Sequence, residues 1–180
     1  MMDQGKIRIV LSGPESSGKS TLAAALAARF NMPLAPEYAR VHLEAGKPYP
    51  QTAHDLTELA RQHLAWQRQH VPDDAACGIF DTDMLNYFIW ADVAFGQVPE
   101  EIQHWLAAET HHIHLLCKPD LPWQDDPLRE FPDLVKRQAL FDRHVLELEQ
   151  RGIRHFVIHG EGDARLAVAE SAFQEASAAN

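Results

Sequence analysis

Short apolar runs alternate with amphipathic segments along most of this chain. Buried strands are predicted at 7–11, 33–35, 77–80, 112–117 and 155–159. Between them, apolar residues recur three and four positions apart, which is typical of helices, over 19–30, 53–70, 84–95, 133–151 and 163–178. Shorter helices are expected at about 38–45 and 99–109. Strands and helices that alternate in this way predict an α/β fold, with a five-stranded parallel sheet and helices on both faces.

Residue types at the ends of these segments support the predicted boundaries. Thr52 is a candidate N-cap for the helix at 53–70, and Gly96 and Gly152 are expected to end the helices that precede them. Four residues of the helix at 84–95 are expected to face the core: Leu85, Phe88, Ile89 and Val93.

The first strand runs into a phosphate-binding motif. Residues 13–20 match the G-x-x-x-x-G-K-[ST] pattern of a P-loop and are followed by a strong helix former. Gly13 and Gly18 let the backbone turn so that successive N–H groups point at phosphate oxygens, and the helix dipole adds positive potential. Lys19 can reach the β- and γ-phosphates, and the Ser20 hydroxyl can ligate Mg²⁺. We therefore expect a nucleoside triphosphate to be bound by Gly13, Pro14, Glu15, Ser16, Ser17, Gly18, Lys19, Ser20 and Thr21.

Composition narrows the class of protein. The chain has 180 residues and a formal net charge of −10, with no block of Lys and Arg, which argues against a nucleic-acid partner. No apolar run approaches the roughly 20 residues of a membrane span, and the N-terminus leaves no room for a signal peptide. We expect one cytoplasmic domain over 1–180, without a membrane partner, and we make no prediction of its oligomeric state.

The type of reaction depends on residues outside the P-loop. Ligands of parallel sheets bind beyond the carboxyl ends of the strands, which brings the segments 37–40, 81–83, 118–129 and 159–165 to the P-loop. Asp81 can hold Mg²⁺, but Thr82 follows it where hydrolytic ATPases usually carry a Glu that orients water. The proline-punctuated segment at about 118–132 suggests a lid, with Arg129 or the more distal Arg137 as a cation for the transferring phosphoryl group. These features favour a small-molecule kinase over a hydrolase.

A series of motifs then resembles a known family. GPESSGKSTLA, EYAR, FDTD, PDLPWQDDPLR and a late Gly-x-x-x-x-Arg at 160–165, in this order, resemble the nicotinamide-riboside kinase domain of the NadR-type NAD-salvage proteins. The resemblance implies a P-loop kinase fold and transfer of the ATP γ-phosphate to the ribose 5′-hydroxyl of nicotinamide riboside. The chain departs from the family in two ways. It has no room for the adenylyltransferase domain of NadR, so it would be a stand-alone kinase, and Pro127 stands where the family tends to have Gly.

Each candidate residue also has a structural interpretation. Glu37 is a candidate base for the acceptor hydroxyl or a carboxylate at a helix N-terminus. Asp81 is a candidate Mg²⁺ ligand that also contacts ribose, or a strand-end cap, and either acid could accept the proton. Asp83 binds ribose hydroxyls or caps the next helix. Arg40 faces substrate or phosphate, or pairs along its own helix.

The remaining candidates are aromatic or cationic. Tyr38 and Trp90 would stack on a nicotinamide ring or pack in the core, and Trp123 in the lid is equally open. Arg129 is expected at the phosphates, whereas Arg137 is either a second lid cation or a solvated helix residue. Arg165 is expected near the adenine pocket. His111, His112 and His114 suggest a metal site, but with no Cys or carboxylate nearby we interpret them as a polar strand end.

ATP and Mg²⁺ are thus the expected cofactors, and a small nucleoside is the expected partner. Two alternatives remain: a P-loop kinase for another nucleoside or small hydroxyl compound, and a nucleotide-switched ATPase or binding module.

Overall fold

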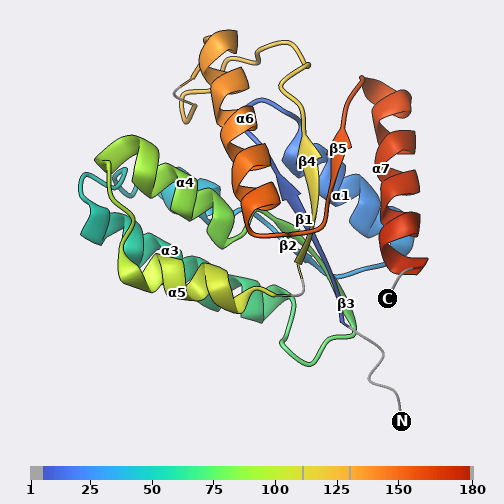
Figure 1. Ribbon diagram of the computed structural model, residues 1–180, viewed down its shortest axis with the longest axis horizontal. Helices are drawn as coiled ribbons and strands as arrows, with labels where there is room; N and C mark the ends of the chain where they lie inside the picture. The colour runs from blue at the N-terminus through green and yellow to red at the C-terminus, as the bar shows by residue number, and fades with distance from the viewer. Residues whose placement is uncertain (1–5, 111, 130, 179–180) are drawn as a thin grey trace.

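The computed structural model describes residues 6–110, 112–129 and 131–178, which surround a parallel β-sheet (Figure 1). Within these residues the sheet has five strands, in the order β2-β3-β1-β4-β5. They are β1 (Ile7–Ser12), β2 (Leu34–Ala35), β3 (Cys77–Asp81), β4 (His112–Cys117) and β5 (His155–Ile158). All neighbouring strands are parallel, as predicted. The P-loop strand β1 is central, and its Ile9 pairs with Ile79 of β3 and Ile113 of β4.

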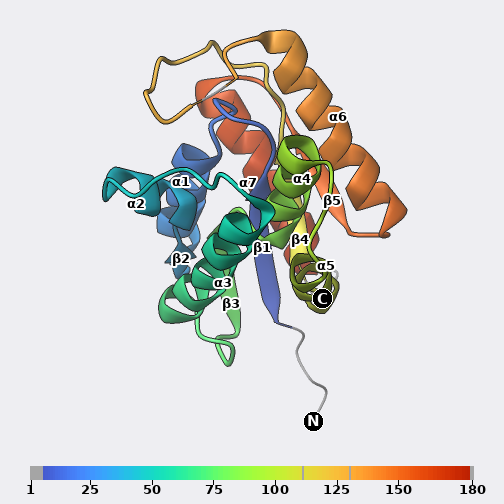
Figure 2. The ribbon, with the colours of Figure 1, turned by 90° about the vertical axis from the view of Figure 1, so that its left-hand side faces the viewer.

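Helices cover both faces of the sheet (Figures 1 and 2). One face carries α1 (Lys19–Phe30) and α7 (Gly162–Ala178), and the other carries α3 (Ala53–His70), α4 (Met84–Phe95), α5 (Glu100–Ala108) and α6 (Leu134–Gln150). The helix α2 (Tyr38–Glu44) follows β2. Successive residues of β1 point to opposite layers: Ile9 and Leu11 pack with α1 and α7, whereas Val10 belongs to the other face. Burial on both faces explains why the strands read as continuous apolar runs.

The helix boundaries follow the capping residues. Thr52 and Asp55 form a reciprocal capping box at the start of α3, which satisfies two backbone N–H groups that have no partner within the helix. Gly96 and Gly152 have φ angles of 66° and 63°, as residues that end a helix often do. The prediction for Val93 is wrong, because its side chain is 53% exposed. Helix α4 packs against α3, α5 and α6. Because it is buried on several sides, one set of apolar residues spaced three and four positions apart does not define its buried surface.

The segment from 118 to 132 connects β4 to α6, and its described residues form neither helix nor strand. It passes beyond the carboxyl end of β4, where the P-loop also lies (Figure 1). We call this segment the lid. In the described part of the chain, no helix is both long enough and apolar enough to span a membrane.

Candidate nucleotide and acceptor site

The P-loop joins β1 to α1 and has a backbone shape that its sequence favours. Gly13, Ser16 and Gly18 have φ angles of 124°, 54° and 76°. A Cβ atom at Gly13 would lie 2.5 Å from the carbonyl oxygen of Cys117, so only glycine fits there. The Ser17 hydroxyl and the Lys19 ammonium both donate hydrogen bonds to the Pro14 carbonyl, at 2.7 and 2.8 Å. The loop is therefore held in shape by its own residues.

A cavity of about 970 Å³ opens in front of the P-loop. Its volume is at the upper end of the range typical of small-ligand sites. All nine predicted residues of the P-loop segment, 13–21, line it. Of the other predicted site residues, those in the wall are Glu37, Arg40, Trp90, Arg129 and Arg165. The wall thus combines the P-loop with residues from α2, α4, the lid and α7.

Two carboxyl groups near the P-loop have raised pKa values. Burial, and then the charge of Asp81, raise the pKa of Glu37 to about 7, although Lys19 and Arg40 oppose this rise. Burial also raises the pKa of Asp81, which is only 3% exposed at the end of β3. The Asp81 carboxylate hydrogen-bonds to Ser20, while its Oδ1 is buried without a partner. Asp81 is not among the described residues that line the cavity, so Ser20 lies between it and the open space.

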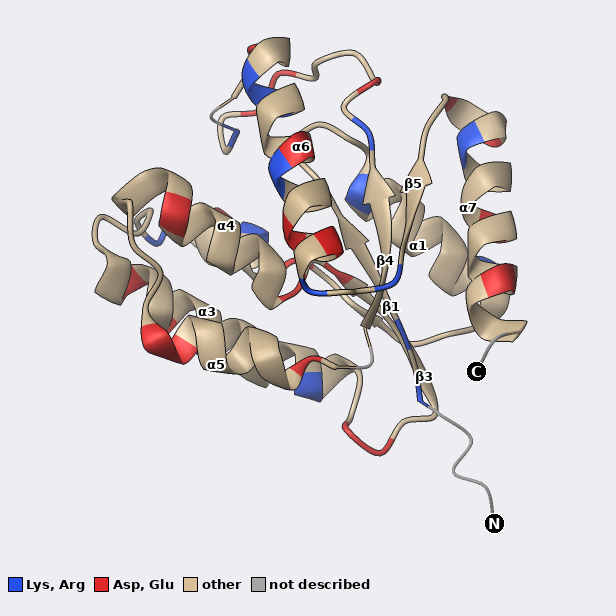
Figure 3. Ribbon diagram, viewed as in Figure 1, with Lys and Arg blue, Asp and Glu red and all other residues tan. Residues whose placement is uncertain are grey.

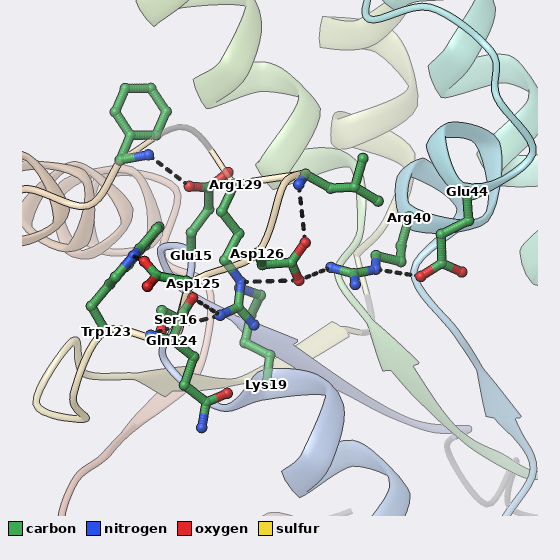
Figure 4. A network of polar contacts seen from close by, with 12 residues as sticks. Glu15, Ser16, Lys19, Arg40, Glu44, Trp123, Gln124, Asp125, Asp126 and Arg129 are labelled. Carbon is green, nitrogen blue, oxygen red and sulfur yellow. Dashed lines mark hydrogen bonds and ion pairs between the residues drawn. The ribbon is translucent and has the colours of Figure 1, made fainter.

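The lid is attached to the P-loop through the two residues that follow Pro14 (Figure 4). The Ser16 hydroxyl accepts a hydrogen bond from the Gln124 backbone N–H at 3.2 Å, and lies 3.4 Å from an Arg129 guanidinium nitrogen. A Glu15 carboxylate oxygen accepts a hydrogen bond from the backbone N–H of Phe131 at 3.0 Å. The general P-loop pattern leaves both positions open, and this chain uses them to hold the lid.

A single lid carboxylate connects two cations of the cavity wall (Figure 4). Oδ2 of Asp126 is 2.6 Å from Nη1 of Arg40 and 3.7 Å from Nε of Arg129. Arg40 also pairs with Glu44 at 2.7 Å, one turn along α2. Arg40 therefore makes the predicted pair along its own helix and also lines the cavity, while its contact with substrate or phosphate stays a prediction.

Arg165 connects several loops through hydrogen bonds to their backbone carbonyl groups. Its guanidinium donates to the backbone carbonyls of Ser17 at 2.6 Å, Gly160 at 3.0 Å and Lys118 at 3.1 Å. It also pairs with Asp120 at 2.8 Å. Arg165 is 4% exposed, so its first role is to join the P-loop to the ends of β4 and β5, although it also lines the cavity.

Aromatic rings form one part of the wall, and only one of the two predicted rings belongs to it. Trp90 lines the cavity, with the Tyr49 ring 6.2 Å away in an edge contact. The Tyr49 hydroxyl donates to the Leu128 carbonyl of the lid at 2.7 Å. The sequence did not identify Tyr49 as a site residue. The only indication was that an aromatic side chain stands between two prolines in a predicted loop. Tyr38 is outside the described wall: its hydroxyl donates to Gln62 and its ring packs on Trp66.

Asp83 and Arg137 also differ from expectation. Asp83 is 1% exposed, caps α4 by accepting from the Leu85 N–H at 3.0 Å, and is absent from the described cavity wall. Its helix-capping interpretation is confirmed, and the structure does not bring it to the cavity wall, where we expected it to bind ribose hydroxyls. Arg137 is 3% exposed and lies over the Trp123 ring, so it is not a solvated helix residue.

The donor set is suited to a nucleotide and its divalent ion. The backbone N–H groups of a P-loop and the Lys19 ammonium are donors that bind phosphate oxygens. The Ser20 hydroxyl and the Asp81 carboxylate are oxygen ligands of the kind that Mg²⁺ prefers. The unpartnered Oδ1 of Asp81 marks a buried acceptor that a cation or its water would satisfy.

Comparisons with known proteins place this geometry among P-loop proteins. A family model described as "AAA domain" matches residues 8–165. No curated protein matches the sequence. A crystal structure of NadR protein in complex with NR is similar with a TM-score of 0.78 and 22% identity, and the match covers 96% of this chain and 52% of that one. NadR in complex with NAD and AMP-PNP gives a TM-score of 0.72 and 20% identity, with coverages of 96% and 50%.

A third similar structure is a thymidylate kinase from Ehrlichia chaffeensis, with a TM-score of 0.64 and 15% identity over 95% of this chain and 98% of that one. The chain spans about half the length of the NadR chains it matches. At these identities the similarity shows the fold alone, which this chain shares with NadR and with a thymidylate kinase.

Proposed function

This chain belongs to the AAA domain family, and on that premise we propose that it is an ATP-dependent kinase acting on the ribose 5′-hydroxyl of nicotinamide riboside. The observation that carries the proposal is the position of Glu37, which lines the same cavity as the P-loop. Burial there raises the pKa of its carboxyl group to about 7. A base with this pKa suits proton removal from a hydroxyl near neutral pH. The resemblance to NadR, one structure of which holds NR, supports the choice of acceptor.

The chain's residues divide the reaction between them. The P-loop N–H groups and Lys19 hold the triphosphate, and the acceptor oxygen attacks the γ-phosphorus as the bond to the β-phosphate oxygen breaks. Glu37 takes the hydroxyl proton, and the products are ADP and the phosphorylated nucleoside. Ser20 and Asp81 would hold Mg²⁺, which offsets phosphate charge when bound. Arg129 stabilises charge on the transferring group, and the lid excludes water that would otherwise hydrolyse ATP.

The aromatic wall supports a flat, positively charged acceptor. A pyridinium ring gains both apolar contact and cation–π attraction from a Trp face. Trp90, with Tyr49 beside it, supplies such a surface within the cavity. Along α6, Lys and Arg residues are interspersed with Asp and Glu, and α7 carries a single Arg among its acidic residues (Figure 3). This distribution suits a small ligand better than a nucleic acid.

The test is a nucleoside panel with coupled detection of ADP. We expect ADP formation to depend on nicotinamide riboside and to be far slower with other nucleosides and small hydroxyl compounds. Preference for another nucleoside would refute the proposed acceptor but not the kinase activity. Steady hydrolysis of ATP that no acceptor changes would instead favour a nucleotide-switched ATPase.

A matched pair of lysine variants tests the site itself. Lys19→Ala should abolish turnover, because it removes the P-loop cation, while Lys47→Ala in an exposed loop should not change it. Turnover that survives Lys19→Ala would refute the assignment of the P-loop as the phosphate site.

A further inference from the structure

A second polar cluster lies outside the cavity, where three chain segments meet. Asp83 begins α4, Glu109 ends α5, and His112 and His114 project from the same face of β4. Oδ2 of Asp83 is 2.9 Å from Nδ1 of His112 and 3.2 Å from Nε2 of His114. Oε2 of Glu109 is 3.6 Å from Nδ1 of His112. The expectation that no carboxylate lies near these histidines is therefore wrong, and His111 lies outside the described residues.

The hydrogen bonding of this cluster is incomplete. The Glu109 side chain is 10% exposed, and its Oε1 is buried without a hydrogen-bond partner. Asp83 is 1% exposed and makes a hydrogen bond with Glu109, so one of these two carboxyl groups must carry a proton when no metal is bound. If both were ionised they would repel one another, and buried carboxylates are costly unless a cation compensates them. A divalent cation would replace that proton and neutralise both.

The histidines are oriented as metal ligands usually are. Nδ1 of His114 lies 3.2 Å from the Ser12 hydroxyl, which directs Nε2 of the same ring towards Asp83. A ligating histidine typically makes such a second hydrogen bond through its other ring nitrogen. The Phe80 ring stacks on His112 with centroids 5.4 Å apart and fixes that ring as well.

The ligand atoms of Asp83, His112 and His114 lie close enough together for one metal ion, because all are within 4.8 Å of one another. Bonds of about 2.0 to 2.2 Å in a tetrahedron place neighbouring ligand atoms roughly 3.3 to 3.6 Å apart. Oδ2 of Asp83 is 2.9 Å from the His112 nitrogen and 3.2 Å from the His114 nitrogen. Imidazole nitrogens combined with carboxylate oxygens suit Zn²⁺, whereas Mg²⁺ prefers oxygen ligands in an octahedron.

We propose that Asp83, His112 and His114 bind one Zn²⁺ ion, and that the adjacent Glu109 carboxylate completes a structural site separate from the nucleotide cavity. The ion joins the segment after β3 to the end of α5 and the start of β4, which follow that segment in the chain only after α4 and α5. None of the four residues is part of the described cavity wall, so the site does not depend on the proposed kinase activity.

The full chain, stripped of metal by a chelator and dialysed, provides the test. We expect it to bind one equivalent of Zn²⁺, measured by elemental analysis, and to give the intense visible absorption of tetrahedral Co²⁺ when cobalt is used as the probe. Zn²⁺ should also raise the thermal unfolding midpoint. Failure to bind either ion stoichiometrically would overturn the proposal.

Matched histidine variants locate the ion. His112→Asn should weaken Zn²⁺ binding by more than about 100-fold, since even losing an outer partner of a ligand commonly costs 10- to 100-fold. His155→Asn is the control, because His155 is likewise a half-buried histidine at the first position of a strand. If His112→Asn does not fold, Glu109→Gln gives the same test with little change in shape. Equal binding by the wild type and the folded ligand variants would assign the metal to surface histidines and refute the site.

Discussion

Replacing Glu37 by Gln tests whether this carboxyl is the proton acceptor. With a pKa of about 7, about a tenth of Glu37 is ionised at pH 6 and about nine tenths at pH 8. The value of kcat/KM in the wild type should therefore rise about tenfold over this range. A carboxyl at its ordinary pKa would give a flat profile over the same range.

The Glu37→Gln variant should lose about 10²- to 10⁴-fold in kcat and lose this pH dependence. Initial rates measured from pH 5.5 to 8.5 with saturating ATP provide the assay, and Glu44→Gln, an exposed carboxylate on the same short helix, is the control. A wild-type profile that is flat from pH 6 to 8, or a variant that keeps the rising limb, would refute the reasoning.

The raised pKa of Glu37 also affects the stability of the fold, and this effect tests the pKa itself without an activity assay. The folded-state pKa of Glu37 lies above the unfolded value of 4.5, so the folded protein binds the extra proton between pH 4.5 and about 7. Stability is therefore lost as pH rises through that window, by up to about 3 kcal/mol. Glu37→Gln should raise the unfolding free energy at pH 8 and leave it unchanged at pH 4. Denaturant titrations at both pH values measure this difference.

Three further predictions concern the cavity and the core. Gly13→Ala should lower the unfolding free energy by about 3 kcal/mol, because the new Cβ meets the Cys117 carbonyl. The control is Gly46→Ala, which is at a positive φ but in open space and should lower the unfolding free energy by about 1 kcal/mol. Equal denaturation midpoints for the two variants would contradict this prediction. Trp90→Ala should raise KM for the acceptor about tenfold in steady-state kinetics and leave KM for ATP unchanged, and an equal effect on both would place the ring elsewhere. Burial lowers the pKa of His144 to about 4, so the unfolded state binds more protons below pH 6.5, and stability should fall as pH drops from 6.5 to 4. His144→Gln should flatten that part of the stability profile, and an unchanged profile would exclude His144 as its source.

Sequence alone predicted those parts of the fold that local chemistry determines. The P-loop residues are contiguous, and the N-cap at Thr52 stands next to the helix that it begins, so both could be recognised without a partner segment. Helix periodicity placed most boundaries within a residue or two for the same reason. The strand order could not be obtained in this way, because it depends on pairings between residues far apart in the chain.

The misplaced site residues share one cause. Asp83 and Tyr38 follow the carboxyl ends of strands, as functional residues in such sheets do, but the direction of each side chain depends on its tertiary partners. Asp83 turns to two histidines on β4, and Tyr38 turns to α3. Tyr49 reaches the cavity wall only because the lid, almost eighty positions later, passes above it. Proximity of this kind leaves no trace in local spacing.

The central position of β1 also determines when the nucleotide cradle can form. Its Ile9 needs Ile79 on one side and Ile113 on the other, and Gly13 is fitted against Cys117. As the chain leaves the ribosome, its first twenty residues therefore contain the complete P-loop sequence. The contacts that fix the shape of this loop are not available until β4 has been synthesised. Long-range pairing of this kind is slow and leaves apolar strands exposed while it is incomplete. Fragments that end before β4 should consequently bind no nucleotide, although they contain every residue of the P-loop.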